Sequence, residues 1–351
     1  MKASQLFKIG EFRTVDVEVP VPHGKELLVK VGACGICGSD IPRIFELGTS
    51  KQKYPLTLGH EFGGEIVSVG EDADPGLVGK RGAIFPCIPC RKCDPCLTAD
   101  YAMCLDYDYL GSRSDGGFAE YCLVPSEWHF VESTNPNLSD DAMGMVEPCT
   151  VAQHAVRKSG LTAGQSILIF GAGPIGQMAA RWAKIFGASL VVLVDVLEEK
   201  VEFAKARGNI VLNSMTMNID EEFRKLNNGK PADIVIEGTG AGAALGLGIE
   251  CVKTFGTVLM MGNPHRDTTI KLHQHSQILR KELTIQGIWN SHYAAPINEW
   301  HYTVKMMDEG VMQVEDLITH RSSLEDLPKL CEDIYTHKVS ICKAMYSTNA
   351  K

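Results

Sequence analysis

The decapeptide Ile167-Leu168-Ile169-Phe170-Gly171-Ala172-Gly173-Pro174-Ile175-Gly176 joins an apolar run to a G-x-G-x-x-G motif. The apolar run predicts a buried strand, and Pro174 opens a predicted helix, Pro174–Phe186, which is the context that a dinucleotide-binding turn requires. Glycines there allow a tight turn and a close approach of the backbone to a pyrophosphate at the helix N-terminus. The stretch therefore predicts a Rossmann fold whose cofactor-binding turn comprises Gly171, Gly173, Pro174, Ile175 and Gly176.

Beyond this turn the chain continues with strands and helices in alternation. The pattern predicts a strand at Leu190–Val194, a helix at Glu198–Arg207 and later strands at Ile234–Ile236 and Val258–Met261, as in a doubly wound parallel sheet. Asp195 ends the second strand about 20 residues after the motif, where a carboxylate binds the ribose 2′-hydroxyl and repels a 2′-phosphate. No arginine follows Asp195 directly, so NAD is favoured over NADP. Thr239 and Gly262 follow later strands and are predicted to lie near the nicotinamide.

The part of the chain before the turn is richer in strands. Residues 5–35, 56–85 and 117–131 carry strand patterns, and a helical period begins near Ser139, a candidate N-cap. The sequence therefore predicts an α/β protein with a β-rich domain over residues 1–155 and a Rossmann domain over residues 156–285.

Residues 87–104 contain four cysteines in the spacing C-x2-C-x2-C-x7-C. Four thiolates at this spacing can close a tetrahedral zinc site that leaves no position for a substrate, so a structural role is predicted. An iron–sulfur cluster is the main alternative from spacing alone. Cys87 lies nearby but outside the pattern. The predicted ligands are Cys90, Cys93, Cys96 and Cys104.

A second set of candidate metal ligands is dispersed along the chain. Cys37, His60 and a carboxylate from Glu61 or Glu147 would make a three-ligand zinc site with a fourth position for water or substrate. Zinc in such a site acts as a Lewis acid that lowers the pKa of a bound alcohol. Each residue alone is weak evidence, because a single buried cysteine is more often part of the core.

The stretch Gly59–Gly70 has the form G-H-E-x2-G-x5-G and resembles the signature of zinc-containing alcohol dehydrogenases of the medium-chain superfamily. The resemblance extends over essentially the whole chain. It implies a GroES-like catalytic domain, a return of residues 286–351 to that domain, two zinc ions and one NAD per chain, and a homodimer or homotetramer.

The resemblance also implies roles for single residues. Cys37 and His60 resemble zinc ligands, and Glu61 and Glu147 resemble the two acidic positions around that zinc. Which of the two glutamates binds zinc directly stays open, and water could bridge one of them. Asp40 resembles the carboxylate that orients the ligand histidine, and Ser39 the hydroxyl that passes on the substrate proton. Many relatives place a relay histidine five residues after the ligand cysteine, where this chain has Pro42. Proton exit must therefore differ, through water or Glu147.

Three stretches resemble the bacterial subfamily that oxidises galactitol 1-phosphate to tagatose 6-phosphate: Asp40–Phe45, Tyr107–Tyr121 and Gly287–Asn290. A phosphate would need cations, for which Arg43, Arg113 and Lys53 are candidates, although both arginines could instead form interdomain salt bridges. Tyr54 and Trp289 could line the pocket or belong to the core. The alternatives are a free-polyol, butanediol or threonine dehydrogenase. A catalytically silent NAD(H)-binding protein is disfavoured because all four candidate ligands are present.

Composition limits the other functional classes. The chain has 351 residues, 44% hydrophobic and 22% charged, with a net charge of −9, which disfavours nucleic acids and anionic membranes as partners. The first ten residues, MKASQLFKIG, lack the apolar core of a signal peptide, so a cytoplasmic location is expected. The 12 cysteines then indicate reduced thiols and metal binding rather than disulfides.

Overall fold

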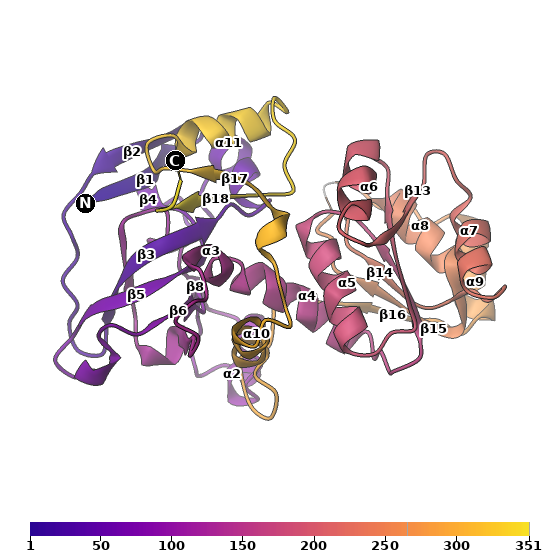
Figure 1. Ribbon diagram of the computed structural model, residues 1–351, viewed down its shortest axis with the longest axis horizontal. Coiled ribbons are helices and arrows are strands. Elements are labelled where there is room, and N and C mark those ends of the chain that lie inside the picture. The colour runs from indigo at the N-terminus through magenta and orange to yellow at the C-terminus, as the bar shows by residue number, and fades with distance from the viewer. Residues whose placement is uncertain (265, 351) are drawn as a thin grey trace. The chain divides into compact units, whose positions relative to one another are not determined.

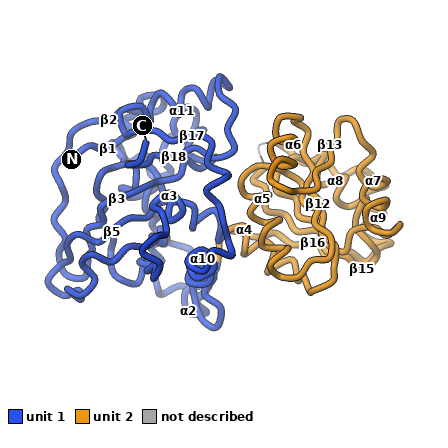
Figure 2. The backbone as a smooth tube through the Cα atoms, in the orientation of Figure 1, with its two compact units in different colours: residues 1–150, 292–351 blue, residues 151–291 orange. Residues whose placement is uncertain are grey.

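A computed structural model describes residues 1–264 and 266–350 of the chain (Figure 1). The chain divides into two compact units (Figure 2). Unit 1 combines residues 1–150 with residues 292–351, and unit 2 comprises residues 151–291. The borders therefore fall at 150 and 291, against the expected 155 and 285, and the last part of the chain joins the unit that the first part forms.

Unit 1 is built on a seven-stranded sheet in the order β10-β6-β5-β3-β18-β17, with β9 also paired to β3. All pairs are antiparallel except β17 with β18. A three-stranded sheet, β2-β1-β4, accompanies it. The strands are β1 (Lys2–Lys8), β2 (Glu11–Asp16), β3 (Leu27–Gly35), β4 (Leu56–Thr57), β5 (Glu61–Val69), β6 (Arg81–Ile84), β9 (Tyr121–Val124), β10 (Phe130–Glu132), β17 (Ile318–Ser322) and β18 (Lys343–Ser347).

The end of β3 is the place where distant parts of the chain meet. Gly35, the last residue of β3, pairs with Glu61 of β5 on one side and with Met345 of β18 on the other. Apolar residues of β3 and β5, among them Val29, Val31 and Phe62, are buried in the core of this unit. The register of three strands thus fixes the start of the segment that carries Cys37.

Short helices complete unit 1. They are α1 (Asp40–Pro42), a π-helix (Arg43–Leu47), α2 (Asp94–Leu97), α3 (Asp140–Met143), α10 (Glu299–Asp308) and α11 (Leu327–Tyr335), while α4 (Val146–Lys158) runs from unit 1 into unit 2. The hydroxyl of Ser139 accepts a hydrogen bond from the Ala142 N–H, so the predicted N-cap is confirmed. The helical stretch predicted from there is interrupted, because Gly144 ends α3 before α4 begins.

Unit 2 is a parallel six-stranded sheet in the order β13-β12-β11-β14-β15-β16, which is the strand order of a Rossmann fold. Its strands are β11 (Ser166–Phe170), β12 (Leu190–Asp195), β13 (Ile210–Asn213), β14 (Ala232–Glu237), β15 (Val252–Met260) and β16 (Thr284–Gly287). Its helices are α5 (Pro174–Ile185), α6 (Glu198–Lys205), α7 (Ile219–Leu226), α8 (Gly242–Cys251) and α9 (Leu272–Arg280). The predicted α/β class with a β-rich part and a Rossmann part is confirmed.

Among the described residues, no helix combines the length and the apolar character that crossing a bilayer requires.

Candidate metal and cofactor sites

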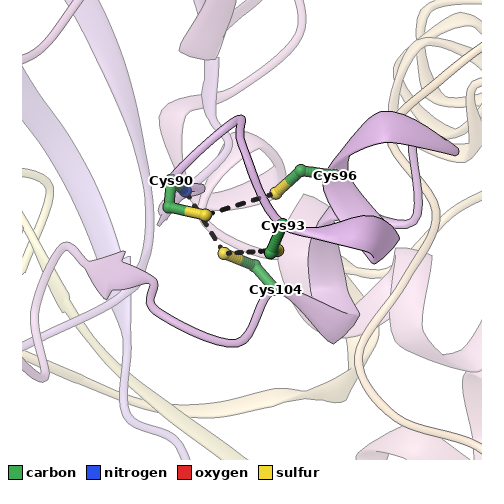
Figure 3. Close-up of side chains that lie close together, drawn as sticks. All are labelled: Cys90, Cys93, Cys96 and Cys104. Carbon is green, nitrogen blue, oxygen red and sulfur yellow. Dashed lines mark hydrogen bonds between the residues drawn. The ribbon is translucent and has the colours of Figure 1, made fainter.

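The four-cysteine lobe brings its thiols together as predicted (Figure 3). The sulfurs of Cys90, Cys93, Cys96 and Cys104 all lie within 4.8 Å of one another. The Cys93–Cys104 and Cys90–Cys96 sulfur separations are 3.8 and 4.0 Å. A tetrahedron with zinc–sulfur bonds of about 2.3 Å has edges of about 3.8 Å. The arrangement therefore suits a single tetrahedral ion, whereas a cluster of several irons would hold its ligands further apart.

Backbone donors also support thiolate character in the lobe. The Lys92 and Cys93 N–H groups, the first of them most strongly, lower the pKa of Cys90 to about 6. The Cys90 N–H donates to the Cys104 sulfur at 3.2 Å. Cys87 does not belong to the group of sulfurs that lie within 4.8 Å of one another. Cys87 therefore stays outside the ligand set, in agreement with its position outside the spacing.

The dispersed residues form a second group. Single ligand atoms of Cys37, His60 and Glu61 lie within 4.8 Å of one another. Cys37 follows the end of β3, and His60 and Glu61 stand at the start of β5, so the pairing of these strands brings them together. Gly59 precedes the histidine with φ +91°, and a Cβ there would come within 2.7 Å of the Cys34 sulfur and of the Phe118 ring. The first glycine of the G-H-E motif thus allows the turn that aims His60 inward.

Glu147 lies at the edge of this group. It is buried, and burial raises the pKa of its carboxyl to about 7 although His60 acts in the opposite direction. Its Oε1 accepts a hydrogen bond from the Tyr109 hydroxyl at 3.3 Å. The Tyr109 ring meets the His60 ring edge-on, with centroids 5.8 Å apart. The structure therefore places Glu61 inside the three-residue group and Glu147 beside it.

Lys343 is a site residue that the sequence analysis missed. The residue is only 4% exposed, and its ammonium forms an ion pair with the Glu61 carboxylate and donates to the Ile36 carbonyl at 3.0 Å. The sequence contained one signal, namely a lysine within Lys343–Ser347, a strand whose other side chains are mostly apolar. A buried lysine is rare unless it is paired, so this position implied a buried acid.

The chemistry of the donors tests whether a metal ion fits the dispersed site. A thiol, an imidazole and a carboxylate that present ligand atoms within 4.8 Å of one another form a donor set that suits zinc. The group is largely buried, and the buried carboxyl groups of Asp40 and Glu147 lie beside it. In addition, His60 Nδ1 is buried without a hydrogen-bond partner in the described structure. The residues therefore fit a divalent cation.

The cofactor turn has the predicted geometry. Gly171 follows β11 with φ +105°, Gly173 caps α5, and Pro174 opens it. A Cβ at Gly176 would lie 1.9 Å from the Gly171 carbonyl oxygen, so the third glycine is required by the chain itself. A Cβ at Gly173 would meet no atom within 4 Å. Gly173 therefore leaves open the space through which a pyrophosphate would approach the helix N-terminus.

The remaining cofactor residues lie at the carboxyl edge of the same sheet. Asp195 Oδ2 accepts from the Ala172 N–H at 2.8 Å, and Oδ1 accepts from the two N–H groups that follow it. Thr239 donates through its N–H and its hydroxyl to the buried Glu237 carboxylate. A Cβ at Gly262 would come within 2.6 Å of the Thr239 nitrogen, so these two loops pack against each other.

Comparisons with known proteins found family models that match each of the two parts of the chain. Residues 23–134 match the model of the alcohol dehydrogenase GroES-like domain, and residues 174–309 match that of zinc-binding dehydrogenases. Galactitol 1-phosphate 5-dehydrogenase of Escherichia coli K12 is 34% identical over 328 residues, covering 93% of this chain and 94% of the relative. The chain belongs to the zinc-containing alcohol dehydrogenase family. The predicted family membership and dehydrogenase class are thereby confirmed.

Further members of the zinc-containing alcohol dehydrogenase family are similar over the full length. Sorbitol dehydrogenase of Bacillus subtilis is 31% identical, with 99% of this chain and 98% of the relative covered. The crystal structure of galactitol-1-phosphate dehydrogenase from E. coli superposes with a TM-score of 0.90 at 32% identity, covering 99% and 100% of the chains. A zinc-binding dehydrogenase of Sinorhizobium meliloti 1021, solved bound to NADP, has a TM-score of 0.89 at 27% identity, with 99% and 98% covered.

The residues next to the ligands are placed as follows in this family member. The Asp40 carboxylate is fully buried, accepts from the Cys37 N–H at 3.0 Å and lies 3.6 Å from His60 Nδ1. Ser39 is exposed at the N-terminus of α1. Pro42, the last residue of α1, carries no group that can transfer a proton.

The candidate substrate residues have partners of their own. Arg43 forms a salt bridge at 2.9 Å with Asp40, a local partner three residues before it in the same unit. Arg113 stacks on the Tyr107 ring at 3.8 Å and donates to the Tyr107 carbonyl at 2.8 Å, and it forms no ion pair within the described chain. The Tyr54 hydroxyl accepts from the Thr49 N–H, and Trp289 is 55% exposed. Phe118 is fully buried in the core.

The two glycines of the cofactor turn provide a matched pair of variants. Gly173→Ala is expected to unfold like the wild type but to bind NAD+ roughly tenfold more weakly, because its Cβ enters the open space. Gly176→Ala is expected to lose about 1–3 kcal/mol of unfolding free energy through its contact with the Gly171 carbonyl. Urea unfolding and cofactor titration by fluorescence measure both. Wild-type cofactor affinity in Gly173→Ala would show that no pyrophosphate approaches there.

Proposed function

We propose that this dehydrogenase transfers a hydride from a secondary alcohol of a polyol phosphate to NAD+, with galactitol 1-phosphate as substrate and tagatose 6-phosphate as product. The observation that carries the proposal is the group of Cys37, His60 and Glu61, whose ligand atoms lie within 4.8 Å of one another, in a chain that carries the dinucleotide turn. The choice of substrate is supported by the similarity to galactitol 1-phosphate 5-dehydrogenase. We further propose that it acts in the cytoplasm as a homodimer or homotetramer.

In the proposed mechanism, Cys37 and His60 would hold the catalytic zinc together with Glu61 or Glu147. Zinc, when bound, would supply a Lewis acid that lowers the pKa of the substrate hydroxyl, and NAD+ would supply the hydride acceptor. Asp40 orients the ligand segment through the Cys37 N–H and faces His60 Nδ1. The exposed Ser39 hydroxyl takes the substrate proton. Because Pro42 cannot relay it, the proton leaves through water or Glu147.

The preference for NAD rests on Asp195. Three backbone N–H groups fix its carboxylate at the end of β12, where it would accept hydrogen bonds from a ribose 2′-hydroxyl. The same fixed negative charge would repel a 2′-phosphate. Since the relative from S. meliloti was solved with NADP, both cofactors belong in the functional test.

The test is the absorbance of reduced cofactor at about 340 nm with free and phosphorylated polyols, each with NAD+ and NADP+. We expect turnover of galactitol 1-phosphate with NAD+ and much weaker turnover with NADP+. Metal analysis of the wild type and of Cys37→Ser accompanies the assay, and the variant should lose one of two ions. Turnover of free polyols alone would exclude the phosphorylated substrate, and an unchanged metal content in Cys37→Ser would exclude the dispersed metal site.

A free-polyol dehydrogenase is the second candidate, and one observation favours it. Arg43, a cation proposed for phosphate binding, is already paired with the buried Asp40 carboxylate. A guanidinium held in this way has fewer donors available for a second anion. The similarity to sorbitol dehydrogenase over nearly the whole chain is consistent with this alternative. The same substrate panel decides between the two.

A further inference from the structure

The two carboxylates beside the Cys37–His60 pair have partners of different kinds. Glu61 is paired with the Lys343 ammonium, which is itself buried. Glu147 has the neutral Tyr109 hydroxyl as a donor, at 3.3 Å from Oε1. An ion pair in a buried place is broken only at high cost, whereas a single hydrogen bond from an uncharged donor is weaker. The orientation of Glu147 therefore depends on a weaker contact, and on Tyr109 in particular.

Tyr109 is well placed to control this orientation. It ends β8 (Asp108–Tyr109), which pairs with β7 (Cys87–Ile88). The N–H groups of the three residues 112–114 donate to its carbonyl at 2.9 to 3.2 Å. Its side chain is 8% exposed, with the ring edge-on to His60 and the hydroxyl on Glu147. One rigidly held side chain thus contacts a candidate zinc ligand and the carboxylate next to it.

We propose that Tyr109 is a positioning residue that fixes the Glu147 carboxylate with respect to the metal held by Cys37 and His60. The proposal rests on the proposed function, because it requires that metal. Hydrogen bonds to the groups around a metal fix their orientation, and their loss typically weakens metal binding or activity about 10- to 100-fold. Because the bond to Glu147 is long, we place the effect of losing the hydroxyl near the lower limit, about tenfold.

The experiment compares Tyr109→Phe with Tyr107→Phe. The first variant removes the hydroxyl and keeps the ring against His60. The second removes a hydroxyl two residues away that makes no hydrogen bond within the described part of the chain. Chelator competition measures metal affinity at the dispersed site. Visible spectra of the cobalt-substituted proteins report its ligand geometry, with the four-cysteine site contributing equally to each spectrum. We expect about tenfold weaker binding and a changed spectrum for Tyr109→Phe only.

A Glu147→Gln background separates positioning from a packing effect. If Tyr109 acts through Glu147, adding Tyr109→Phe to Glu147→Gln changes affinity and spectrum no further. Additive effects would overturn the proposal, as would a wild-type affinity and spectrum in Tyr109→Phe. Cys37→Ser distinguishes this failure from failure of the proposed function. If that variant keeps both metal ions, the dispersed metal site is absent and both proposals are excluded. If it loses one ion, the results for Tyr109→Phe bear only on the role of Tyr109.

Discussion

Lys343→Met is expected to lower the free energy of unfolding of the metal-free protein by about 3–5 kcal/mol and to strengthen the attraction of the dispersed site for a divalent cation. The substitution keeps the length of the side chain but removes the charge that neutralises Glu61, which is only 2% exposed. It also leaves the Ile36 carbonyl without its donor at the end of β3. An uncompensated buried carboxylate is among the costliest defects that a single substitution can create. Urea unfolding and metal analysis measure the two effects.

Two further variants test the cause of this loss. Lys343→Arg keeps the charge and is expected to retain most of the stability. Lys343→Met combined with Glu61→Gln removes both charges and should recover much of what the single variant loses, because no buried charge remains unpaired. If the double variant is as unstable as the single one, altered packing around β18 causes the loss of stability, and the broken ion pair does not.

Cys96→Ser is expected to remove the metal from the four-cysteine lobe and to cost on the order of 5 kcal/mol of unfolding free energy. The lobe has little apolar packing of its own, since Leu97 is 72% and Leu105 79% exposed. Its only regular elements are α2, a single 3-10 turn and the short β7–β8 pair. Metal binding must therefore supply most of the order. Thermal unfolding and limited proteolysis between residues 90 and 105 measure the loss.

Cys87→Ser is the matched control for the lobe. Cys87 lies close in the sequence and is also buried, but its thiol belongs to no ligand group. We expect this variant to keep its metal and its resistance to protease. A loss of metal equal to that of Cys96→Ser would mean that the ligand set has been assigned incorrectly.

The Rossmann half was predictable because its signals are local. A strand, a glycine turn and a helix follow one another between residues 166 and 185, and each imposes its own pattern on a few neighbouring positions. The four-cysteine lobe was equally predictable, since all of its ligands lie within 15 residues and their spacing alone suggests a tetrahedral site. In both cases the interacting groups are close in the sequence.

The partners of the dispersed site were not predictable in the same way. Lys343 and Glu61 are 282 positions apart, and Tyr109 and Glu147 are 38 apart. Such pairs arise from strand register, and no periodic pattern in the sequence predicts them. The partner of Arg43 is a local one, because Asp40 lies only three residues before it on the same short helical segment.

The position of β18 beside β3 has a consequence for the synthesis of the protein. During translation, residues 151–291 emerge completely, and can fold as a unit, before Lys343 leaves the ribosome. Throughout that interval Glu61 and Cys37 exist without the cation that balances them. A nascent chain would therefore be expected to acquire its dinucleotide-binding unit first and to complete its dispersed metal site only when the last strand is inserted. Premature termination shortly before residue 343 would then yield a chain with an intact cofactor fold and an unfinished metal site.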